Sequence, residues 1–257
     1  MRLMVYSKST ERYIDDWRHD DALIVTRHPT EAVLDLAGSW DEVIAIGGGS
    51  VIDTAKIISR TPVIAVPTTF AGASRTSHAV YWEGERKLNF ETPRPVTILK
   101  PEYLKTLPED TYKYSKTDCI CHALESLISK KATTESRFYA SIALELVNKD
   151  NLEDMLTASL LAADAFEITG TNLLHALSYP LTAIYGVQHG RALLFLLPRI
   201  LPYVEELVDI NIPVERYIEV DADLEHVVEE ALKYPKIFET RKTINEETLI
   251  ELLKAPQ

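Results

Sequence analysis

Four side chains in the second half of the chain have the types and spacing to bind a divalent metal ion. Asp118 and His122 lie four residues apart in a stretch with helical periodicity, so they share one helix face. His175 and His189 lie on either side of an expected bend at Pro180, which can bring the two imidazoles together. Three imidazoles and one carboxylate form a borderline donor set that suits Zn²⁺ or Fe²⁺. Taken singly, the Asp118/His122 pair also fits a surface contact, and each histidine fits a structural role.

Three consecutive glycines have the placement of a phosphate-binding turn. Gly47, Gly48 and Gly49 follow an apolar strand-like run and precede a helical pattern. Backbone N–H groups at such a turn, and the positive end of the helix behind it, favour a pyrophosphate. Ser50 is expected to cap this helix, with Asp53 completing a capping box. A tight capped turn without a ligand would show the same residues, and the spacing matches neither GxGxxG nor GxxxxGK.

A second polar loop follows the next predicted strand. Thr68, Thr69, Gly72 and Ser74 supply hydroxyls and a glycine within residues 67–74. Ligands of open α/β sheets bind outside the carboxyl ends of the strands. Two such loops on successive parallel strands therefore face one crevice, although an ordinary polar turn is the alternative for this loop alone.

The elements that carry these residues differ between the two halves of the chain. Near-continuous apolar runs before residue 100 predict a parallel sheet covered on both faces, with a hairpin over 78–95. Helical periodicity dominates from about residue 108. Strands are predicted at 2–7, 21–26, 41–46, 62–66 and 96–99, and helical segments at 10–18, 30–40, 51–59, 110–131, 134–148, 151–178, 189–206 and 213–254.

These patterns predict an α/β plus all-α protein. Residues 1–105 are expected to form the α/β domain, and residues 106–257 the helical domain. Pro180, Pro198 and Pro213 punctuate the helical half of the sequence, and Pro180 is expected to end a helix.

Composition narrows the classes of function. The 257 residues carry 27 basic and 39 acidic side chains, a net charge of −12, which argues against a nucleic-acid or anionic-membrane binder. No apolar run approaches the ~20 residues of a membrane span. Cys119 and Cys121 are expected on different faces of one helix, so a disulfide is not expected. A reducing cytoplasm is the predicted setting.

The motifs, in this order, resemble the iron-containing (group III) alcohol dehydrogenase superfamily, which includes maleylacetate reductases and glycerol dehydrogenases. The matching stretches are Gly47–Ser50 with Asp53 and Lys56, Pro67–Thr69, Asp118-x-x-x-His122-Ala123-x-Glu125, and His175 through Pro180 to His189-Gly190. The sequences of residues 67–74 and 100–110 are most similar to those of the maleylacetate reductases.

The resemblance implies a fold of the dehydroquinate synthase type, in which residues 1–105 form a Rossmann-like dinucleotide-binding domain and residues 106–257 a helical domain for metal and substrate. It also implies NAD or NADP and a divalent Fe or Zn ion as cofactors. The family metal ligands carry over to Asp118, His122, His175 and His189. The implied cofactor contacts are Ser7, Gly47, Gly48, Gly49, Ser50, Asp53, Thr68, Thr69, Gly72 and Ser74. A small alcohol or carbonyl substrate and a homo-oligomer, such as a dimer, are implied as well.

Two departures from the family pattern bear on chemistry. Ser7, followed by Lys8, occupies the place of an Asp that reads the ribose hydroxyls of NAD, which favours NADP slightly. Tyr179 stands where the alcohol dehydrogenase branch has a second histidine linked to proton transfer. We therefore expect Tyr179, with His175 and His189, to form the catalytic group, and the acid–base step to differ from that branch.

The function expected from this combination is metal-dependent, NAD(P)-linked interconversion of a small alcohol and its aldehyde or ketone. One alternative is a dehydroquinate synthase-type lyase or cyclase, in which the nicotinamide is recycled within a turnover. The other is a shortened, non-catalytic relative that binds nucleotide, an alternative suggested by the length of the chain and by Tyr179. Net turnover of nicotinamide would separate the first from the other two.

Overall fold

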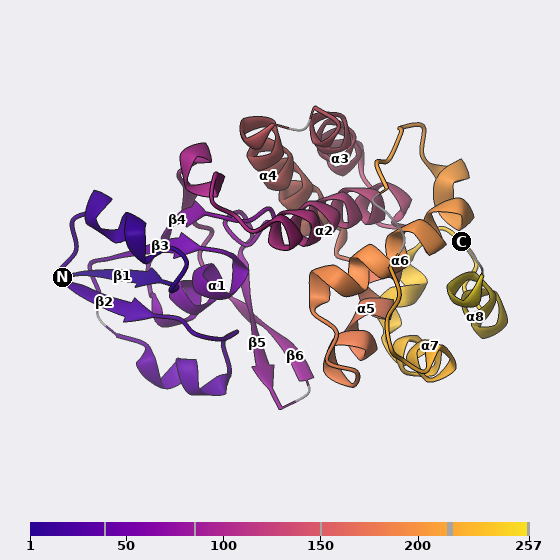
Figure 1. Cartoon of the computed structure of the whole chain (residues 1–257), viewed down its shortest axis with the longest axis horizontal. Helices are drawn as coiled ribbons and strands as arrows, with labels where there is room; N and C mark the ends of the chain where they lie inside the picture. The colour runs from indigo at the N-terminus through magenta and orange to yellow at the C-terminus, as the bar shows by residue number, and fades with distance from the viewer. Residues whose placement is uncertain (39, 85, 150, 215–217, 256–257) are drawn as a thin grey trace. The chain divides into compact units, whose positions relative to one another are not determined.

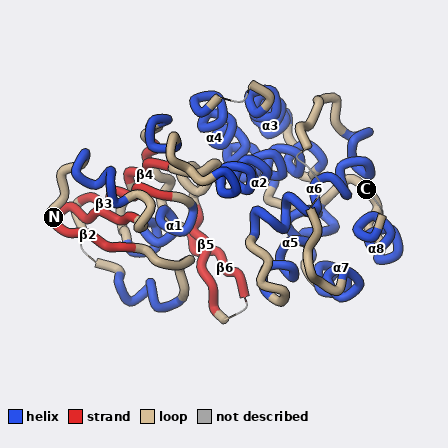
Figure 2. The backbone as a smooth tube through the Cα atoms, in the orientation of Figure 1, coloured by secondary structure: helices blue, strands red, loops and turns tan. Residues whose placement is uncertain are grey.

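The computed structural model describes residues 1–38, 40–84, 86–149, 151–214 and 218–255. The chain divides into two compact units, Met1–Pro108 and Glu109–Gln257, which are drawn with their element labels in Figure 1. In the described ranges the strands belong to the first unit and the second is built of helices (Figure 2). The predicted combination of an α/β and a helical part is confirmed. The binding roles expected for residues 1–105 and 106–257 stay predictions.

The first unit is organised around a five-stranded parallel sheet of order β2-β1-β3-β4-β7. Its strands are β1 (Arg2–Tyr6), β2 (Asp21–Ile24), β3 (Glu42–Gly47), β4 (Ile64–Pro67) and β7 (Val96–Thr97). Tyr6 pairs with Ile46, and Gly47 pairs with Pro67. The carboxyl ends of β1, β3 and β4 therefore meet at one edge of the sheet.

Both faces of the sheet are covered, which explains the near-continuous apolar strands. Val43 and Ala45 of β3 face helix α1 (Gly49–Ile58) and belong to one buried cluster with its Ile52. Ile44 and Ile46 point to the opposite face. There they pack in a second cluster whose other members include Tyr103, Tyr13, Ile14 and Trp17, from the 3₁₀ segments Pro101–Leu104 and Glu11–Asp16 and the residue after it.

Helix α1 begins two residues earlier than expected. Gly48 is its N-cap, with extended backbone, and its carbonyl accepts hydrogen bonds from the N–H groups of Val51 and Ile52. The expected cap by Ser50 is wrong, because Ser50 already lies inside the first turn. A side chain at the cap itself would be crowded, since a Cβ on Gly48 would lie 3.1 Å from Cγ2 of Thr69.

The expected hairpin is confirmed as β5 (His78–Glu83) and β6 (Arg86–Glu91), paired antiparallel. Lys56 of α1 has a fully buried side chain, and its Nζ donates to Thr76 Oγ1 at 2.9 Å and to the His78 carbonyl at 2.7 Å. This buried cation ties α1 to the start of β5.

Seven α-helices make up most of the described second unit. They are α2 (Glu109–Ile128), α3 (Thr134–Val147), α4 (Leu152–Thr169), α5 (Leu173–Ala183), α6 (His189–Val204), α7 (Leu224–Leu232) and α8 (Glu246–Lys254). Helix α2 is buried along most of its length, including the polar side chains of Asp118, His122 and Glu125. It packs against α3, α4, α5 and α6. Buried charged groups need partners, which are supplied by the neighbouring helices.

Pro180 was expected to end a helix of this unit, but it lies within α5. Pro198 lies within α6, in agreement with the helix predicted over 189–206. The turn after Pro180 is kept by the hydrogen bond from the Ile184 N–H to the Pro180 carbonyl at 2.9 Å. The single helix expected over 151–178 is wrong for a different reason, because Gly170, at φ +69°, ends α4 before α5 begins.

The tail expected to be helical over 213–254 contains two short helices, α7 and α8, separated by the 3₁₀ segment Pro235–Glu239. Residues 215–217 of that stretch lie outside the described residues. Cys119 and Cys121 are buried free thiols, as expected. None of the helices in the described ranges combines the length and the apolar character that a bilayer crossing requires.

Candidate functional site

The carboxylate of Asp118 is surrounded by three imidazoles in the second unit. Its Oδ1 lies 3.3 Å from Nε2 of His175, 3.6 Å from Nε2 of His122 and 3.7 Å from Nε2 of His189. The structure thus brings together all four side chains that the sequence selected as metal ligands. Helix geometry supplies the first pair, since residues four apart on α2 share a face. The start of α6 and the middle of α5 supply the other two imidazoles.

The four donors are not equivalent. Within the described residues, Asp118, His175 and His189 offer ligand atoms that all lie within 4.8 Å of one another. His122 stands beside them, with its ring stacked on His175 at 4.6 Å between centroids and on Phe166 at 4.1 Å. His189 is the most accessible, because 30% of its side chain is exposed against 2% for His175.

Charge within the cluster keeps the carboxylate ionised. Burial by itself would raise the pKa of Asp118, but the facing imidazoles of His122, His175 and His189 hold that pKa well below its ordinary value. An ionised carboxylate oxygen surrounded by imidazole nitrogens is a nitrogen-and-oxygen donor set of the kind that Zn²⁺ and Fe²⁺ accept. The residues therefore fit a divalent cation.

Glu125 orients His175 and has no role in the sequence-based prediction. Its side chain is fully buried, and Oε2 lies 2.6 Å from His175 Nδ1 while Oε1 accepts the His175 backbone N–H at 3.0 Å. With the ring proton held on Nδ1 by Glu125, Nε2 is left to face Asp118. Burial lowers the pKa of His175, yet Glu125 and Asp118 together raise it above its ordinary value.

The spacing along α2 is the signal that could have identified Glu125. Asp118, His122 and Glu125 stand at positions i, i+4 and i+7, which lie on one helix face. Asn172 completes the arrangement, because its Nδ2 donates to the Glu125 carbonyl at 3.0 Å and its Oδ1 accepts the N–H of Leu173 at the start of α5. One side chain therefore fixes the start of α5 against α2.

Gly190 allows His189 to approach the cluster. A Cβ on Gly190 would lie 2.5 Å from the Cβ of Tyr114 and 3.0 Å from its backbone, so α6 begins in close contact with α2. The His189 ring is also held by Ser178, whose Oγ lies 3.3 Å from Nδ1. Gly190 belongs to the matching family motif, but the sequence alone indicated no role for it. Its role is to let the backbones of α6 and α2 come close together.

Tyr179 lies one turn beyond His175 on α5. Its hydroxyl accepts a hydrogen bond from Lys236 Nζ at 3.2 Å, and its ring meets the ring of Tyr234 edge-on at 5.3 Å. These contacts link Tyr179 to the 3₁₀ segment after α7.

The glycine turn and the polar loop meet at the carboxyl edge of the sheet in the first unit. The Thr68 N–H donates to the Gly47 carbonyl at 3.0 Å, and the close approach of Gly48 to Thr69 joins the two loops again. Gly49 leaves its backbone open, since a Cβ there would meet only Ala73 at 3.9 Å. Exposed backbone at the start of a helix is the arrangement that binds a phosphate.

Other predicted cofactor contacts occupy different environments. The Ser7 hydroxyl follows β1 at the same edge and lies 3.0 Å from Ser9 Oγ and 3.2 Å from Thr10 Oγ1. Gly72, at φ +80°, makes the turn of the polar loop, and Ser74 is buried beneath it with only 2% of its surface exposed.

Asp53 is the member of the predicted set that lies farthest along α1. It is nearly buried, 3.9 Å from Lys56, and accepts the backbone N–H of Val80 in β5. Burial raises the pKa of Asp53 to about 6, although Lys56 lowers it. Its surroundings are those of a link between helix and hairpin.

Comparison with known proteins gives a consistent result. Residues 113–233 match the model of the Fe-containing alcohol dehydrogenase family, C-terminal domain. The 4-hydroxybutyrate dehydrogenase of Clostridium kluyveri is 31% identical over 192 residues, which cover 60% of this chain and 52% of that one. The NAD-dependent methanol dehydrogenase of Bacillus methanolicus is 29% identical over 58% of this chain and 50% of that one. The chain spans about half the length of these curated relatives.

Solved structures share the fold across the whole chain. An iron-containing alcohol dehydrogenase from Corynebacterium glutamicum superposes with a TM-score of 0.84 at 21% identity, covering 99% of this chain and 87% of that one. A maleylacetate reductase from Agrobacterium tumefaciens gives 0.83 at 22% identity, covering 98% and 88%. At these identities the likeness establishes the architecture of both units.

Proposed function

Because the chain belongs to the iron-containing alcohol dehydrogenase superfamily, we propose that it interconverts a small alcohol and its aldehyde or ketone by hydride transfer with a nicotinamide cofactor. The observation that carries the proposal is the convergence of three imidazole nitrogens on one oxygen of Asp118. Such a donor set offers a divalent cation several ligand atoms at one point.

Asp118, His122, His175 and His189 would hold that cation, for which Fe²⁺ or Zn²⁺ is the proposed identity. A bound divalent ion supplies Lewis-acid chemistry, lowering the pKa of an alcohol or polarising a carbonyl. Glu125 keeps the proton on Nδ1 of His175, so that Nε2 presents its lone pair. The partly exposed His189 leaves one side of the cluster accessible to a substrate.

The first unit would bind the dinucleotide through its phosphates. The backbone N–H groups of Gly49 and Ser50, at the positive end of α1, are placed to donate to a pyrophosphate. Thr68 and Thr69 would add hydroxyl contacts from the adjoining loop, and the lean toward NADP stays a proposal. A bound nicotinamide supplies the hydride chemistry, and the protein supplies its position.

Tyr179 is proposed to take part in proton transfer. It stands one turn after His175, and its hydroxyl shares a hydrogen bond with the Lys236 ammonium, a donor that can stabilise a partly deprotonated oxygen. A purely structural role for this contact predicts that removal of the hydroxyl changes stability and leaves the rate of turnover intact.

The test is net nicotinamide turnover by the full chain loaded with Fe²⁺ or Zn²⁺. Small alcohols with NAD or NADP, and small aldehydes with the reduced forms, are followed by nicotinamide absorbance. We expect turnover that is lost in Asp118→Asn and kept in Asp209→Asn, which removes an exposed carboxylate of the same unit. Turnover that survives Asp118→Asn would refute the role of the cluster.

Two other results would each favour one alternative. Product formation that needs only a trace of nicotinamide, without its net conversion, would favour the lyase or cyclase. Tight nucleotide binding with no product across the panel would favour a non-catalytic relative.

A further inference from the structure

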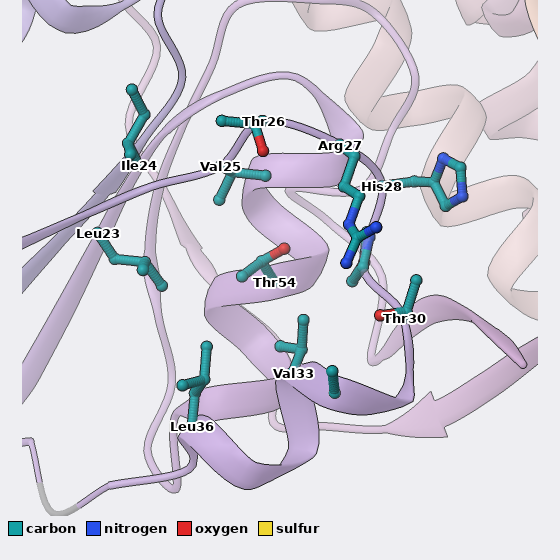
Figure 3. A pocket seen from close by; sticks show the side chains of 12 residues that line it. Leu23, Ile24, Val25, Thr26, Arg27, His28, Thr30, Val33, Leu36 and Thr54 are labelled. Carbon is teal, nitrogen blue, oxygen red and sulfur yellow. The ribbon is translucent and has the colours of Figure 1, made fainter.

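A pocket of about 190 Å³ lies in the first unit, beyond the end of β2. It is smaller than the ~300–1,000 Å³ that hold a whole drug-sized ligand, so it suits one end of a larger molecule. Its walls combine apolar side chains with hydroxyls, an imidazole and a guanidinium (Figure 3). The lining includes Leu23, Val33 and Leu36 on the apolar side, and Thr26, Arg27, His28, Thr30 and Thr54 on the polar side.

The pocket carries positive charge in an acidic protein. Its lining contains Arg27 and, among the described residues, no aspartate or glutamate, although the chain has a net charge of −12. Figure 3 shows the Arg27 side chain reaching into the pocket toward Thr54 and Thr30, whereas the His28 imidazole points away. Within the described ranges, no ion pair or hydrogen bond engages the Arg27 guanidinium.

The pocket adjoins the edge where the glycine turn lies. The Val25 N–H donates to the Tyr6 carbonyl at 2.7 Å, so the segment that leaves β2 starts at the carboxyl end of the sheet. On the other side, Thr54 stands one turn along α1 from Ser50, to whose carbonyl its hydroxyl donates at 2.8 Å. A ligand whose phosphates meet the start of α1 can therefore extend along this helix into the pocket.

We infer that this pocket takes the ribose of an adenosine that carries a 2′-phosphate, with Arg27 as the residue that selects it. The inference rests on the proposed function, because it assigns the cofactor of that reaction as NADP(H). A guanidinium binds the phosphate dianion through paired N–H donors, and the threonine hydroxyls add further donors. Sites for NAD instead use a carboxylate that binds the ribose hydroxyls and repels a phosphate. None lines this pocket in the described part of the chain.

In this proposal the residue that selects the 2′-phosphate is Arg27 and not Lys8. The sequence favoured NADP because Ser7 and Lys8 replace an acidic residue. In the structure Lys8 is paired with Glu11, and the Ser7 hydroxyl is turned to Ser9 and Thr10. Arg27 lines the pocket and, among the described residues, has no such partner.

The experiment measures the binding of two nucleotides that differ only by the phosphate in question. Adenosine 2′,5′-bisphosphate and 5′-AMP are titrated by calorimetry into the full chain, into Arg27→Gln, and into Arg60→Gln. Arg60 is an exposed arginine of the same unit outside the pocket lining, so its variant matches the loss of charge. No metal, substrate or nicotinamide is needed, so the readout is independent of activity.

We expect the wild type to bind the bisphosphate about tenfold to a hundredfold more tightly than 5′-AMP, the size of one charge-assisted contact. Arg27→Gln removes that preference and leaves 5′-AMP binding within about twofold, whereas Arg60→Gln keeps it. The preference should also weaken as salt is added.

Three outcomes would overturn the inference. Equal binding of both nucleotides by the wild type refutes the 2′-phosphate site and leaves the proposed function standing. An equal loss of both in Arg27→Gln shows that Arg27 holds the 5′-phosphate instead. If neither nucleotide binds to the wild type, the inference and the proposed dinucleotide function both fail.

Discussion

Replacement of Glu125 by glutamine should weaken metal binding without removing a ligand. Glutamine has nearly the same shape as glutamate. Its amide oxygen can take the place of Oε1 and accept the hydrogen bond from the His175 backbone N–H. The amide NH₂ would then face Nδ1 of His175, which now lies 2.6 Å from a carboxylate oxygen. A donor facing Nδ1 favours the other tautomer, in which Nε2 carries the proton and cannot bind a cation.

The magnitude follows from what is lost. One of four donors is turned into the wrong tautomer, and loss of an outer-shell carboxylate of this kind lowers metal affinity by about tenfold to a hundredfold. That range equals about 1.4–2.7 kcal/mol of binding free energy. The metal-free variant should also unfold more easily by about 2 kcal/mol, because a buried charge-assisted hydrogen bond is weakened.

The assay is a competition titration of Zn²⁺ or Co²⁺ between the protein and a chromophoric chelator. Ser159→Ala is the control, because it removes a different buried hydrogen bond of the same unit, from Ser159 Oγ to the Leu156 carbonyl. The control should change stability alone. Unchanged metal affinity in Glu125→Gln, with the variant folded, would refute the role assigned to Glu125.

Three further predictions follow from single contacts. Gly190→Ala should lower stability by about 1–3 kcal/mol, because the new Cβ would overlap with the backbone of Tyr114, which cannot rotate away. The same overlap should displace His189 and weaken metal binding. Unchanged thermal unfolding would contradict this prediction. The raised pKa of Asp53, about 6 against 3.8, means that its folded form favours the proton, so stability falls as pH rises from about 4 to 6. Between about pH 4 and 6 the free energy of unfolding of the wild type, measured by urea titration, should fall by an amount on the order of 3 kcal/mol, and Asp53→Asn should remove this fall. The same pH profile in the variant would show that Asp53 is not the titrating group. Tyr179→Phe should lower the maximal rate of the loaded enzyme while metal content stays the same, and a full rate would assign Tyr179 to structure.

Much of the fold could be predicted because each half of the chain obeys one dominant pattern. The apolar runs of β1, β3 and β4 are continuous since both sheet faces are covered, and the hairpin β5–β6 interrupts them with alternating residues and a turn. Helix ends were predicted less well. Pro180 was expected to end a helix but stays inside α5, which is largely buried, so packing outweighs one missing hydrogen bond.

The candidate site was predictable where spacing alone determines a face, as for Asp118 and His122 on α2. The convergence of His175 and His189 on the same carboxylate depends on the bend that follows α5. The sequence predicted this bend at Pro180, which lies inside α5, so the predicted position was only approximate. Glu125 and Gly190 act through contacts made at long range in the sequence, so single-residue patterns did not assign them roles.

The pocket at Arg27 was not predicted for a related reason. Its walls come from the segment after β2, the 3₁₀ segment Glu31–Leu36 and Thr54 of α1, none of which carries a motif. Only the packing of these segments reveals an arginine among hydroxyls. The sequence suggested Lys8 as the residue that selects NADP, and the structure suggests Arg27. The reason is again packing, because the ion pair between Lys8 and Glu11 is a feature of the folded chain.

The most direct test of the metal centre is X-ray absorption spectroscopy of the full chain loaded with one equivalent of Zn²⁺ or Fe²⁺. The four side chains around Asp118 Oδ1 predict a nitrogen-and-oxygen shell with three imidazoles per ion, reduced by one in His189→Ala. An ion bound at one equivalent without an imidazole signature, or with the same imidazole count in His189→Ala, would contradict the account.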